Sequence, residues 1–579
     1  MPPADKQIQI LTRHPERVDT LAEVPGVLGR VYAGRGVAEP AELDRSLVRL
    51  LGPGELSDID RAAERLARAV AASEQIVIVG DFDADGATSV ALAVTLLQAM
   101  GAEHVEFLVP NRFDFGYGLS PEIVDLAAKL YPQLQHDGVL VTVDNGVSSV
   151  TGVSRANGLG MDVIVTDHHL PGSELPDAHA IVNPNLVDCA FPSKSLAGVG
   201  VIYYLLSVTR ARLRSQGWFD ARPEPNMADW LDLVALGTVA DVVPLDQNNR
   251  ILVYQGLKRI RAGRCRPGIQ ALCEVARRDM SKLSASDMGF ALGPRLNAAG
   301  RLDDMTIGIR CLMADNVGAA RELATVLDEL NSTRRELEQT MVTDAELIVS
   351  NHSDDVGDRF GVCVYDETWH QGIVGIVAGR LREKFHRPVI AFAEAGDMAP
   401  DELKGSARSL PELHVRDVLD AIAAKYPGML EKFGGHAMAA GLSIKRVHYP
   451  RFAKAFDEQV RQVIPPEALQ PSITTDGALD DGEFSLEVAR MLEDAGPWGQ
   501  GFPEPRFHDE FRVVNQRVVG QQHLKLVLKR GDRLYDAIAF RQAPLASPDL
   551  VSAVFRLSEN DYGELPTLQL VVEHVAKLG

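Results

Sequence analysis

The chain has 579 residues, of which 46% are hydrophobic and 24% are charged, and its 80 acidic and 59 basic side chains give a net charge of -21. This composition excludes a fully disordered chain, and neither a membrane helix of about 20 apolar residues nor an apolar export signal is visible, so we expect a cytoplasmic protein without membrane contact. Five scattered cysteines without a CxxC pair argue against a zinc ribbon or a disulfide framework, and the acidic balance argues against a non-specific binder of duplex DNA.

The N-terminal half predicts an extension followed by an α/β domain. Residues 1–70 combine helical spacing with turn residues, and we assign no function to this extension. From about residue 75 onward, short apolar runs that end in Gly, Asp or Asn alternate with segments of helical spacing, which is typical of a doubly wound parallel sheet. We therefore predict such a domain over residues 71–250. The predicted strands lie at 75–81, 104–111, 138–146, 161–169 and 179–184.

The C-terminal half predicts a connector and two further domains. A helical connector occupies residues 251–350, and its last helix, from about 315 to 350, carries an apolar stripe that is typical of core packing. A second α/β domain follows over 351–464, and a proline pair marks a linker after it. After about residue 505, five short strands with turn signals favour a small barrel or sandwich, and we predict an OB-like barrel for the domain over residues 467–579.

An acidic motif follows the first predicted strand. Asp81, Asp83 and Asp85 alternate in the sequence DFDADG, so their carboxylates can converge on one side of an extended loop. An EF-hand calcium loop begins with the same spacing, but Leu92 stands where that loop requires a bidentate Glu, and the motif follows a strand rather than a helix. A solvated acidic turn without a metal is the other alternative for this motif taken alone.

Two further predicted strands end in candidate metal ligands. Asp144 follows the run VLVTV, and Asp167, His168 and His169 follow DVIVT. Because the carboxyl ends of parallel strands line one crevice, we expect these side chains to meet the acidic motif there, with Asp241 as a further candidate. Clustered carboxylates repel one another unless cations lie between them, and mixed carboxylate and imidazole ligands suit Mn²⁺ or Mg²⁺, which favours a two-metal site for phosphoryl chemistry. The alternative for the histidine pair is one core and one surface side chain.

The order of these motifs resembles that of the DHH phosphoesterase superfamily, which is named for the triplet seen here at residues 167–169. Three further stretches, at 291–302, 404–409 and 433–442, narrow the resemblance to the RecJ family of bacterial single-strand-specific 5′ exonucleases. The last two of these stretches resemble the DHHA1 domain of that family. The resemblance runs from about residue 70 to the end, and it implies a DHH domain, a DHHA1 domain and an OB-like barrel.

The resemblance also implies roles for individual residues. Asp144 would bridge two Mn²⁺ or Mg²⁺ ions, and His169 would orient the substrate or a ligand or stabilise phosphoryl charge, which makes these two the catalytic residues. Many superfamily members carry a His where this chain has Val79, so coordination of the first ion would be incomplete, weaker or completed by Asp81 or water. The implied metal ligands are Asp81, Asp83, Asp85, Asp144, His168 and Asp241. The implied substrate and DNA contacts are Arg112, Arg295, Asn297, Arg301, Ser406, Arg408 and His436.

The function implied by the resemblance is metal-dependent hydrolysis of single-stranded DNA from its 5′ end to mononucleotides, in recombination and repair. A phosphodiesterase of short oligonucleotides or cyclic dinucleotides would use the same metal core, but such enzymes generally lack the barrel and the N-terminal extension. A non-catalytic replication scaffold is a third possibility, although such proteins tend to lose the metal ligands that this chain retains. The partners expected from the family are the single-strand-binding protein and a RecQ-type helicase.

Overall fold

The computed structural model describes residues 8–14, 21, 23–110, 118–351, 358–396, 399–520, 522–546, 550–561 and 565–578. The chain divides into two compact units, and each unit joins segments that are distant in the sequence. The smaller unit comprises Met1–Leu11 and Glu329–Ile473, and the larger comprises Thr12–Asp328 and Thr474–Gly579. None of the helices in the described part of the chain is long and apolar enough to cross a membrane.

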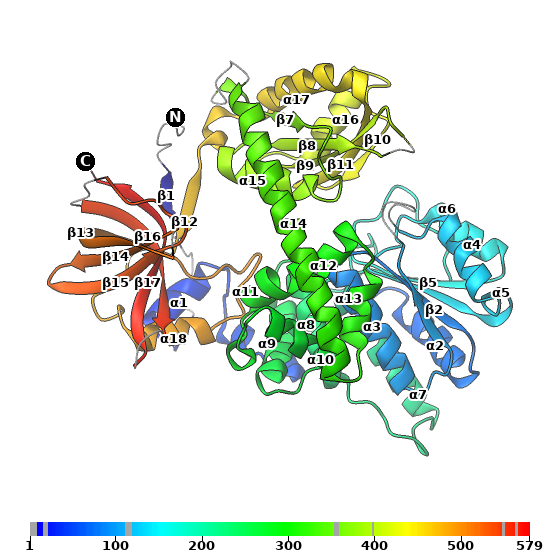
Figure 1. Cartoon of the computed structure of the whole chain (residues 1–579). Coiled ribbons are helices and arrows are strands. Elements are labelled where there is room, and N and C mark those ends of the chain that lie inside the picture. Colours follow the sequence, from blue (N-terminus) through cyan, green and yellow to red (C-terminus); the bar gives the residue numbers. More distant parts are fainter. Residues whose placement is uncertain are drawn as a thin grey trace. The chain divides into compact units, whose positions relative to one another are not determined.

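A five-stranded, fully parallel sheet forms the core of the DHH-like part of the larger unit (Figure 1). All residues of its two central strands β2 and β4 are buried, because helices cover both faces of the sheet. The strand order is β3-β2-β4-β5-β6, so the predicted doubly wound sheet is confirmed. The strands are β2 (Ile76–Gly80), β3 (Val105–Leu108), β4 (Val139–Val143), β5 (Asp162–Thr166) and β6 (Ala180–Val182).

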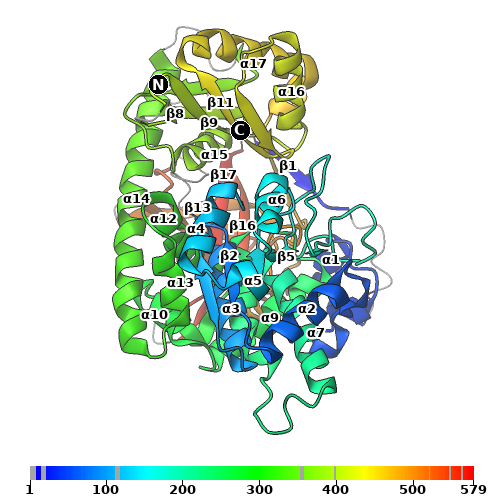
Figure 2. The ribbon, with the colours of Figure 1, turned by 90° about the vertical axis from the view of Figure 1, so that its right-hand side faces the viewer.

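Helices pack on both faces of this sheet (Figures 1 and 2). On one face, apolar side chains of β2, β4 and β5 share a core with those of α4 and α6. On the other face, α3 packs against β2 and β4, and α7 packs against β4 and β5. The helices of this region are α2 (Ile59–Ala71), α3 (Ala84–Ala99), α4 (Pro121–Leu130), α5 (Leu134–Asp137), α6 (Val150–Gly158), α7 (Gly198–Ser215) and α8 (Leu231–Ala240).

The strand order reverses at β2, since β3 and β4 lie on its opposite sides. In open α/β sheets the crevice for a ligand lies outside the carboxyl ends of the strands that flank such a reversal. The fold therefore marks the ends of β2 and β4 as the place to look for a site.

A helical connector leads to the long helix α14 (Val317–Asn351), whose 35 residues match the predicted connecting helix. Leu327 and Met341 of the predicted apolar stripe are buried. The connector contains α9 (Gln247–Arg261), α10 (Pro267–Val275), α11 (Ala285–Asp287), the π-helical turn Met288–Leu292, α12 (Gly293–Leu302) and α13 (Thr306–Met313).

The smaller unit contains a mixed five-stranded sheet in the order β10-β11-β9-β8-β7. Its core packs one sheet face against α16 and α17, while α15 contacts β8 and β9. The described elements are β7 (Val362–Tyr365), α15 (Val374–Phe385), β8 (Val389–Glu394), β9 (Glu402–Arg408), α16 (Val415–Lys425), β10 (Lys432–Gly435), β11 (Ala439–Lys445) and α17 (Tyr449–Val463).

The C-terminal strands close into a five-stranded barrel in the order β13-β14-β15-β17-β16, as an OB fold requires (Figure 1). Its interior is filled by aromatic side chains, among them Phe507, Phe511 and Phe555. The strands are β13 (Phe507–Val519), β14 (His523–Arg530), β15 (Arg533–Ala539), β16 (Leu550–Asn560) and β17 (Thr567–Lys577). The preceding elements are β12 (Ser472–Thr475), which pairs with β1 (Gln9–Thr12), and α18 (Leu486–Asp494).

The N-terminal extension packs against the segment that precedes the barrel. Arg35, just after α1 (Gly26–Ala33), donates hydrogen bonds to both carboxylate oxygens of Asp476, at 2.8 and 3.0 Å. The ring of Tyr32 lies 6.0 Å from that of Trp498 and 6.1 Å from that of Phe502. The structure thus gives this extension a packing role within the larger unit.

Candidate active site

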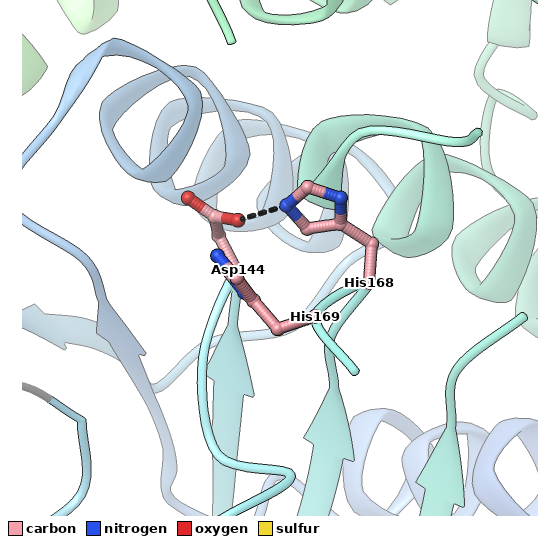
Figure 3. Close-up of side chains that lie close together, drawn as sticks. All are labelled: Asp144, His168 and His169. Carbon is pink, nitrogen blue, oxygen red and sulfur yellow. Dashed lines mark ion pairs between the residues drawn. The ribbon is translucent and has the colours of Figure 1, made fainter. Parts of the chain in front are cut away.

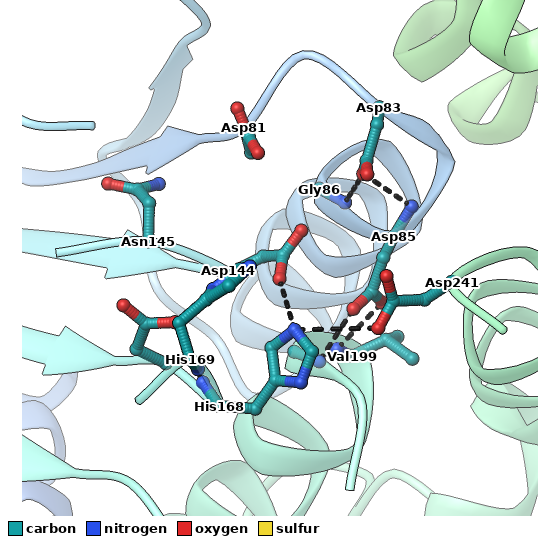
Figure 4. Close-up of polar contacts among 12 residues, drawn as sticks. Asp81, Asp83, Asp85, Gly86, Asp144, Asn145, His168, His169, Val199 and Asp241 are labelled. Atoms are coloured by element: carbon teal, nitrogen blue, oxygen red, sulfur yellow. Dashed lines mark hydrogen bonds and ion pairs between the residues drawn. The ribbon is translucent and has the colours of Figure 1, made fainter. Parts of the chain in front are cut away.

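The acidic and histidine motifs gather at the carboxyl ends of three neighbouring strands. Asp81 follows β2, Asp144 follows β4, and the triplet at 167–169 follows β5. Asp241 reaches the same place from the C-terminal end of helix α8. The predicted convergence of residues about 60 to 160 positions apart is therefore present in the structure (Figure 4).

His168 lies at the centre of this cluster. Its Nε2 atom is 3.1 Å from Oδ1 of Asp144 and 3.4 Å from Oδ2 of Asp241 (Figures 3 and 4). Metal-ligand atoms within 4.8 Å of one another form three overlapping groups: Asp81–Asp83–Asp144, Asp85–His168–Asp241 and Asp144–His168–His169. Asp144 and His168 each belong to two groups, so the cluster can hold two ions close together.

Two acids of the motif are fixed by helix N-termini. One oxygen of Asp83, Oδ1, accepts the backbone N–H groups of Asp85 and Gly86 at 2.9 and 3.0 Å and thereby caps α3. Asp85 accepts the backbone N–H groups of Gly198 and Val199, at 2.6 and 3.0 Å, at the start of α7. These bonds set the orientation of both carboxylates before any ligand binds.

Asp144 is held in a strained and crowded position. Its φ of 62° lies in the left-handed region, which non-glycine residues rarely adopt outside functional sites. A Cβ atom at Gly198 would lie 2.6 Å from the Cβ of Asp144, so only glycine allows α7 to begin this close. The structure therefore maintains an unfavourable backbone geometry that aims this carboxylate into the cluster.

The acids destabilise one another's charged forms. Burial, and then the charge of Asp83, raises the pKa of Asp85 to about 7, although the N–H groups of α7 lower it. Burial and the neighbouring carboxylates also raise the pKa values of Asp144 and Asp241 well above the ordinary range. Such a cluster is electrostatically incomplete by itself, because like charges are buried together.

Asp167 orients His169 and belongs to the site although our ligand assignment from the sequence omitted it. This carboxylate is 1% exposed and its Oδ1 lies 2.8 Å from Nδ1 of His169. Burial alone would raise the pKa of Asp167, but hydrogen bonding and the charge of His169 lower it. Burial alone would lower the pKa of His169, but the hydrogen bond and charge of Asp167 raise it to about 9. The position of Asp167 directly after an apolar strand was the available signal.

The donor atoms of the cluster fit divalent cations. Oδ1 of Asp144 and Oδ2 of Asp241 are buried and form no hydrogen bond with the described residues, and both lie close to Nε2 of His168, itself a candidate metal ligand. A buried carboxylate oxygen without a hydrogen bond is costly unless a cation completes it. The donors are carboxylate oxygens and imidazole nitrogens, which suit Mn²⁺ and Mg²⁺ and include no thiolate. Val79, which replaces the superfamily His, is a fully buried residue of β2.

The predicted contacts on α12 have partners inside the protein. Arg295 is 7% exposed, and its guanidinium pairs with Asp328 at 2.7 Å. Asn297 Oδ1 accepts the backbone N–H of Ala84 at 2.8 Å. Arg301 lies in the last turn of the same helix. DNA contact by these residues stays a prediction, and Arg112 lies outside the described residues.

The smaller unit brings Ser406, Arg408 and His436 together around β9. Ser406 and Arg408 share one face of the strand, and Arg408 Nη1 donates to Ser406 Oγ at 3.0 Å. Ala439 pairs with Arg408 across the sheet and accepts the backbone N–H of His436. Burial, and then the charge of Arg382, lowers the pKa of Arg408, which pairs with no carboxylate in the described part of the chain. We call the group of Ser406, Arg408 and His436 the cationic pocket.

Family models match most of the chain in the same order as these structural parts. The DHH family N-terminal domain matches residues 75–238, the DHHA1 domain matches 357–462, and the RecJ OB domain matches 475–574. The metal-ligand cluster falls in the first region and at the residues directly after it. The cationic pocket falls in the second.

Single proteins resemble the whole chain. The single-stranded-DNA-specific exonuclease RecJ of Escherichia coli is 52% identical over 98% of this chain and 99% of its own length. The RecJ of Haemophilus influenzae is 50% identical over 95% of this chain and 96% of its own length. The crystal structure of Thermus thermophilus RecJ in complex with Mn²⁺ has a TM-score of 0.80 and 29% identity, and the match covers 99% of this chain and 79% of that chain. Near-complete coverage at this identity, together with the three domain models, shows that the chain belongs to the RecJ family.

Proposed function

We propose that this protein is a metal-dependent exonuclease that hydrolyses single-stranded DNA from the 5′ end to mononucleotides, in recombination and repair. The observation that carries the proposal is the convergence of Asp144, His168 and Asp241 on one buried point of a RecJ-family chain. The relatives from E. coli and T. thermophilus are named for action on single-stranded DNA, and solved T. thermophilus structures hold Mn²⁺ or Mg²⁺.

The metal centre would hold two Mn²⁺ or Mg²⁺ ions. We assign Asp81, Asp83 and Asp144 to one ion and Asp85, His168 and Asp241 to the other, with Asp144 between them. Bound ions supply Lewis acidity and neutralise charge during phosphoryl transfer. The chain's own contribution is rigidity, because the bonds from α3 and α7 fix Asp83 and Asp85 and the αL conformation fixes Asp144.

His169 would stabilise the phosphoryl group as charge develops on it. Burial alone would lower its pKa, but the hydrogen bond and charge of Asp167, and then the charges of Asp81 and Asp83, outweigh burial and raise this pKa to about 9, so these carboxylates favour the cationic form of the ring. Asp167 fixes the ring through Nδ1. The backbone oxygen of His169 accepts a hydrogen bond from Asn183 at 2.9 Å, which adds a second restraint.

The cationic pocket would bind a phosphate group of the strand. A half-buried guanidinium without a carboxylate partner is the complement of an anion, and a phosphate oxygen can accept from Arg408 and from the hydroxyl of Ser406. A Cβ atom at Gly375 would lie 3.0 Å from both Ser406 Oγ and Arg408 Nη2, so the start of α15 borders the same pocket. Arg112 and Arg301 remain our proposed further contacts to the strand.

The barrel distinguishes this proposal from action on small substrates. A phosphodiesterase of dinucleotides needs the metal centre and the DHHA1 region, but it has no use for a separate oligonucleotide-binding fold. Here a closed barrel and a matching RecJ OB model occupy the C-terminal part of the chain. The retention of all the proposed ligands in one cluster likewise argues against a non-catalytic scaffold.

The test uses the full chain with Mn²⁺ and single strands labelled at one end. We expect mononucleotides from a 5′-labelled strand at the first time points, slower cleavage of a blunt duplex, and much slower cleavage of a dinucleotide. Release of label first from the 3′ end would contradict the polarity. Equal rates on the dinucleotide and the long strand would contradict the substrate class, and Asp144→Asn serves as the inactive control.

We further propose that the enzyme works in the cytoplasm with a RecQ-type helicase and the single-strand-binding protein. All five cysteines are free thiols, as a reducing compartment requires. An exonuclease restricted to single strands needs a source of unwound DNA, which a helicase supplies. Addition of such a helicase and ATP should convert a resistant duplex into a substrate, and unchanged resistance would contradict this partnership.

A further inference from the structure

Helix α12 lies directly on the start of the acidic motif DFDADG (residues 81–86), which we call the acidic loop of the metal centre. A Cβ atom at Gly300 would lie 1.7 Å from the carbonyl oxygen of Phe82, so the helix backbone touches the loop backbone. Asn297 lies one turn earlier on the same helix face, and its Oδ1 accepts the backbone N–H of Ala84 at 2.8 Å. The motif GPRLNAAGRL therefore contacts the loop on both sides of Asp83.

The contact with Ala84 matters because of how α3 begins. The first N–H groups of a helix have no partner within it, and here they belong to Ala84, Asp85 and Gly86. Asp83 Oδ1 accepts the second and third of these groups, and Asn297 accepts the first. Asp83 Oδ1 therefore caps the helix, while Asp83 Oδ2 accepts no backbone N–H of α3 among the described residues.

Helix α12 is itself firmly held. Arg295 Nε and Nη2 lie 2.9 and 2.7 Å from Asp328 Oδ1, and Nη1 donates to the carbonyl oxygen of Ala291 at 2.7 Å. These bonds to α14 and to the preceding turn fix the rotation of α12. The Asn297 side chain is therefore presented to the loop from a rigid support.

We propose that Asn297 is a positioning residue of the metal centre. Its Oδ1 accepts the Ala84 N–H, so this N–H does not form a hydrogen bond with the Asp83 carboxylate. Our proposed function assigns that carboxylate to a metal ion. Without Asn297, the buried N–H either lacks a partner, which is costly, or takes the adjacent Asp83 oxygen by a shift of the loop. Either change weakens metal binding without removing a ligand.

Calorimetry of Mn²⁺ binding to the full chain tests this role without relying on catalysis. We expect Asn297→Ala to raise the dissociation constant about 10–100-fold, the effect typical of residues that orient metal ligands. Asn297→Asp keeps the accepting oxygen and should bind Mn²⁺ about as well as the wild type. The matched control is Asn316→Ala, which removes an Asn oxygen that accepts the N–H of Ala319 at 3.0 Å at the start of α14.

A second measurement separates positioning from DNA contact. Fluorescence anisotropy of a labelled single strand in EDTA reports DNA binding without metal or cleavage. Positioning predicts unchanged DNA affinity for Asn297→Ala in EDTA. If Asn297 instead contacts DNA, Asn297→Ala weakens DNA binding, Asn297→Asp weakens it further by repulsion, and both bind Mn²⁺ normally, which would overturn the proposal.

Two safeguards keep the result interpretable. If Asn297→Ala does not fold, Asn297→Ser replaces it, because the shorter hydroxyl does not reach Ala84 but keeps a polar group at the helix surface. Wild-type protein that binds no Mn²⁺ would contradict the proposed function itself. Wild-type binding together with normal binding by the folded variant would contradict only the role of Asn297.

Discussion

The metal centre and the cationic pocket have opposite electrostatic defects. The metal centre contains several carboxylates whose pKa values are raised by burial and by their mutual repulsion. The cationic pocket contains Arg408, whose pKa is lowered by burial and then by the charge of Arg382. Arg408 pairs with no carboxylate in the described part of the chain. Each region therefore gathers charge of one sign, carboxylates in the metal centre and guanidinium groups around Arg408.

This contrast underlies the ligand that we propose for each region. Ordinary ion pairs elsewhere in the molecule are complete, as in the pairing of Arg266 with Asp232 at 2.8 Å. We propose divalent cations for the metal centre and a phosphate of the DNA strand for the cationic pocket. Substitutions of Asp144 and Arg408 test the two regions separately.

Asp144→Asn should abolish cleavage of single strands, with a loss of more than about 10³-fold, which exceeds the usual effect of removing one active-site hydrogen-bond donor. Asn tolerates the left-handed φ of this position, so the backbone should persist. Rates with Mn²⁺ on an end-labelled strand give the measurement, and circular dichroism checks the fold. Activity within tenfold of wild type would remove Asp144 from the centre.

Arg408→Met should weaken binding of single strands in EDTA about 10–100-fold, because charged hydrogen bonds of about 1.5–3 kcal/mol are lost. It should not lower the melting temperature, since removal of a half-buried charge without a carboxylate partner among the described residues relieves a desolvation cost. Arg380→Met is the matched control, because Arg380 already pairs with Glu338 at 2.8 Å. Equal losses for both variants would contradict a specific pocket.

Asp144→Asn should also stabilise the metal-free protein. The raised pKa of Asp144 means that its charged form is disfavoured in the folded state, so replacement by a neutral amide should raise the free energy of unfolding at neutral pH. Mn²⁺ should stabilise the wild type further but not this variant. Urea denaturation with and without Mn²⁺ measures both effects, and a metal-free variant less stable than wild type would argue against mutual repulsion.

The smallest effect concerns salt dependence. Arg408→Met should reduce the slope of log Kd against log salt concentration by about 0.7, the value for one phosphate contact on a single strand. Asp144→Asn should leave this slope unchanged in EDTA, since the substitution removes no cation. Titrations of a labelled single strand with each protein at several salt concentrations measure this slope. A slope unaltered by Arg408→Met would argue against a phosphate at that side chain.

The metal centre was largely predictable because it depends on local pattern and sheet topology. Asp81, Asp144 and the DHH triplet each end an apolar strand, and parallel strands place such ends together. Asp241 was harder to place, since it caps a helix and not a strand, and only tertiary packing brings α8 to the cluster. Asp167 was visible in the triplet, but its role depends on the hydrogen bond to His169.

Other features required long-range information. The pairing of Arg35 with Asp476 and the stacking of Tyr32 near Trp498 join segments more than 400 residues apart, and no local pattern announces them. The direction in which Asn297 points was equally hidden, because its motif suggested DNA contact while packing aims the side chain at Ala84. Ser406 and Arg408 could have been placed on one strand face, since alternate residues of a strand share a face.

The most direct test of the central claim is anomalous diffraction from crystals of the full chain grown with Mn²⁺. We predict two manganese peaks about 3.5–4 Å apart, as in other two-metal sites, both within bonding distance of Asp144. One should also contact Asp83, and the other should contact His168 and Asp241. Manganese bound elsewhere, with these side chains left without an ion, would contradict the account.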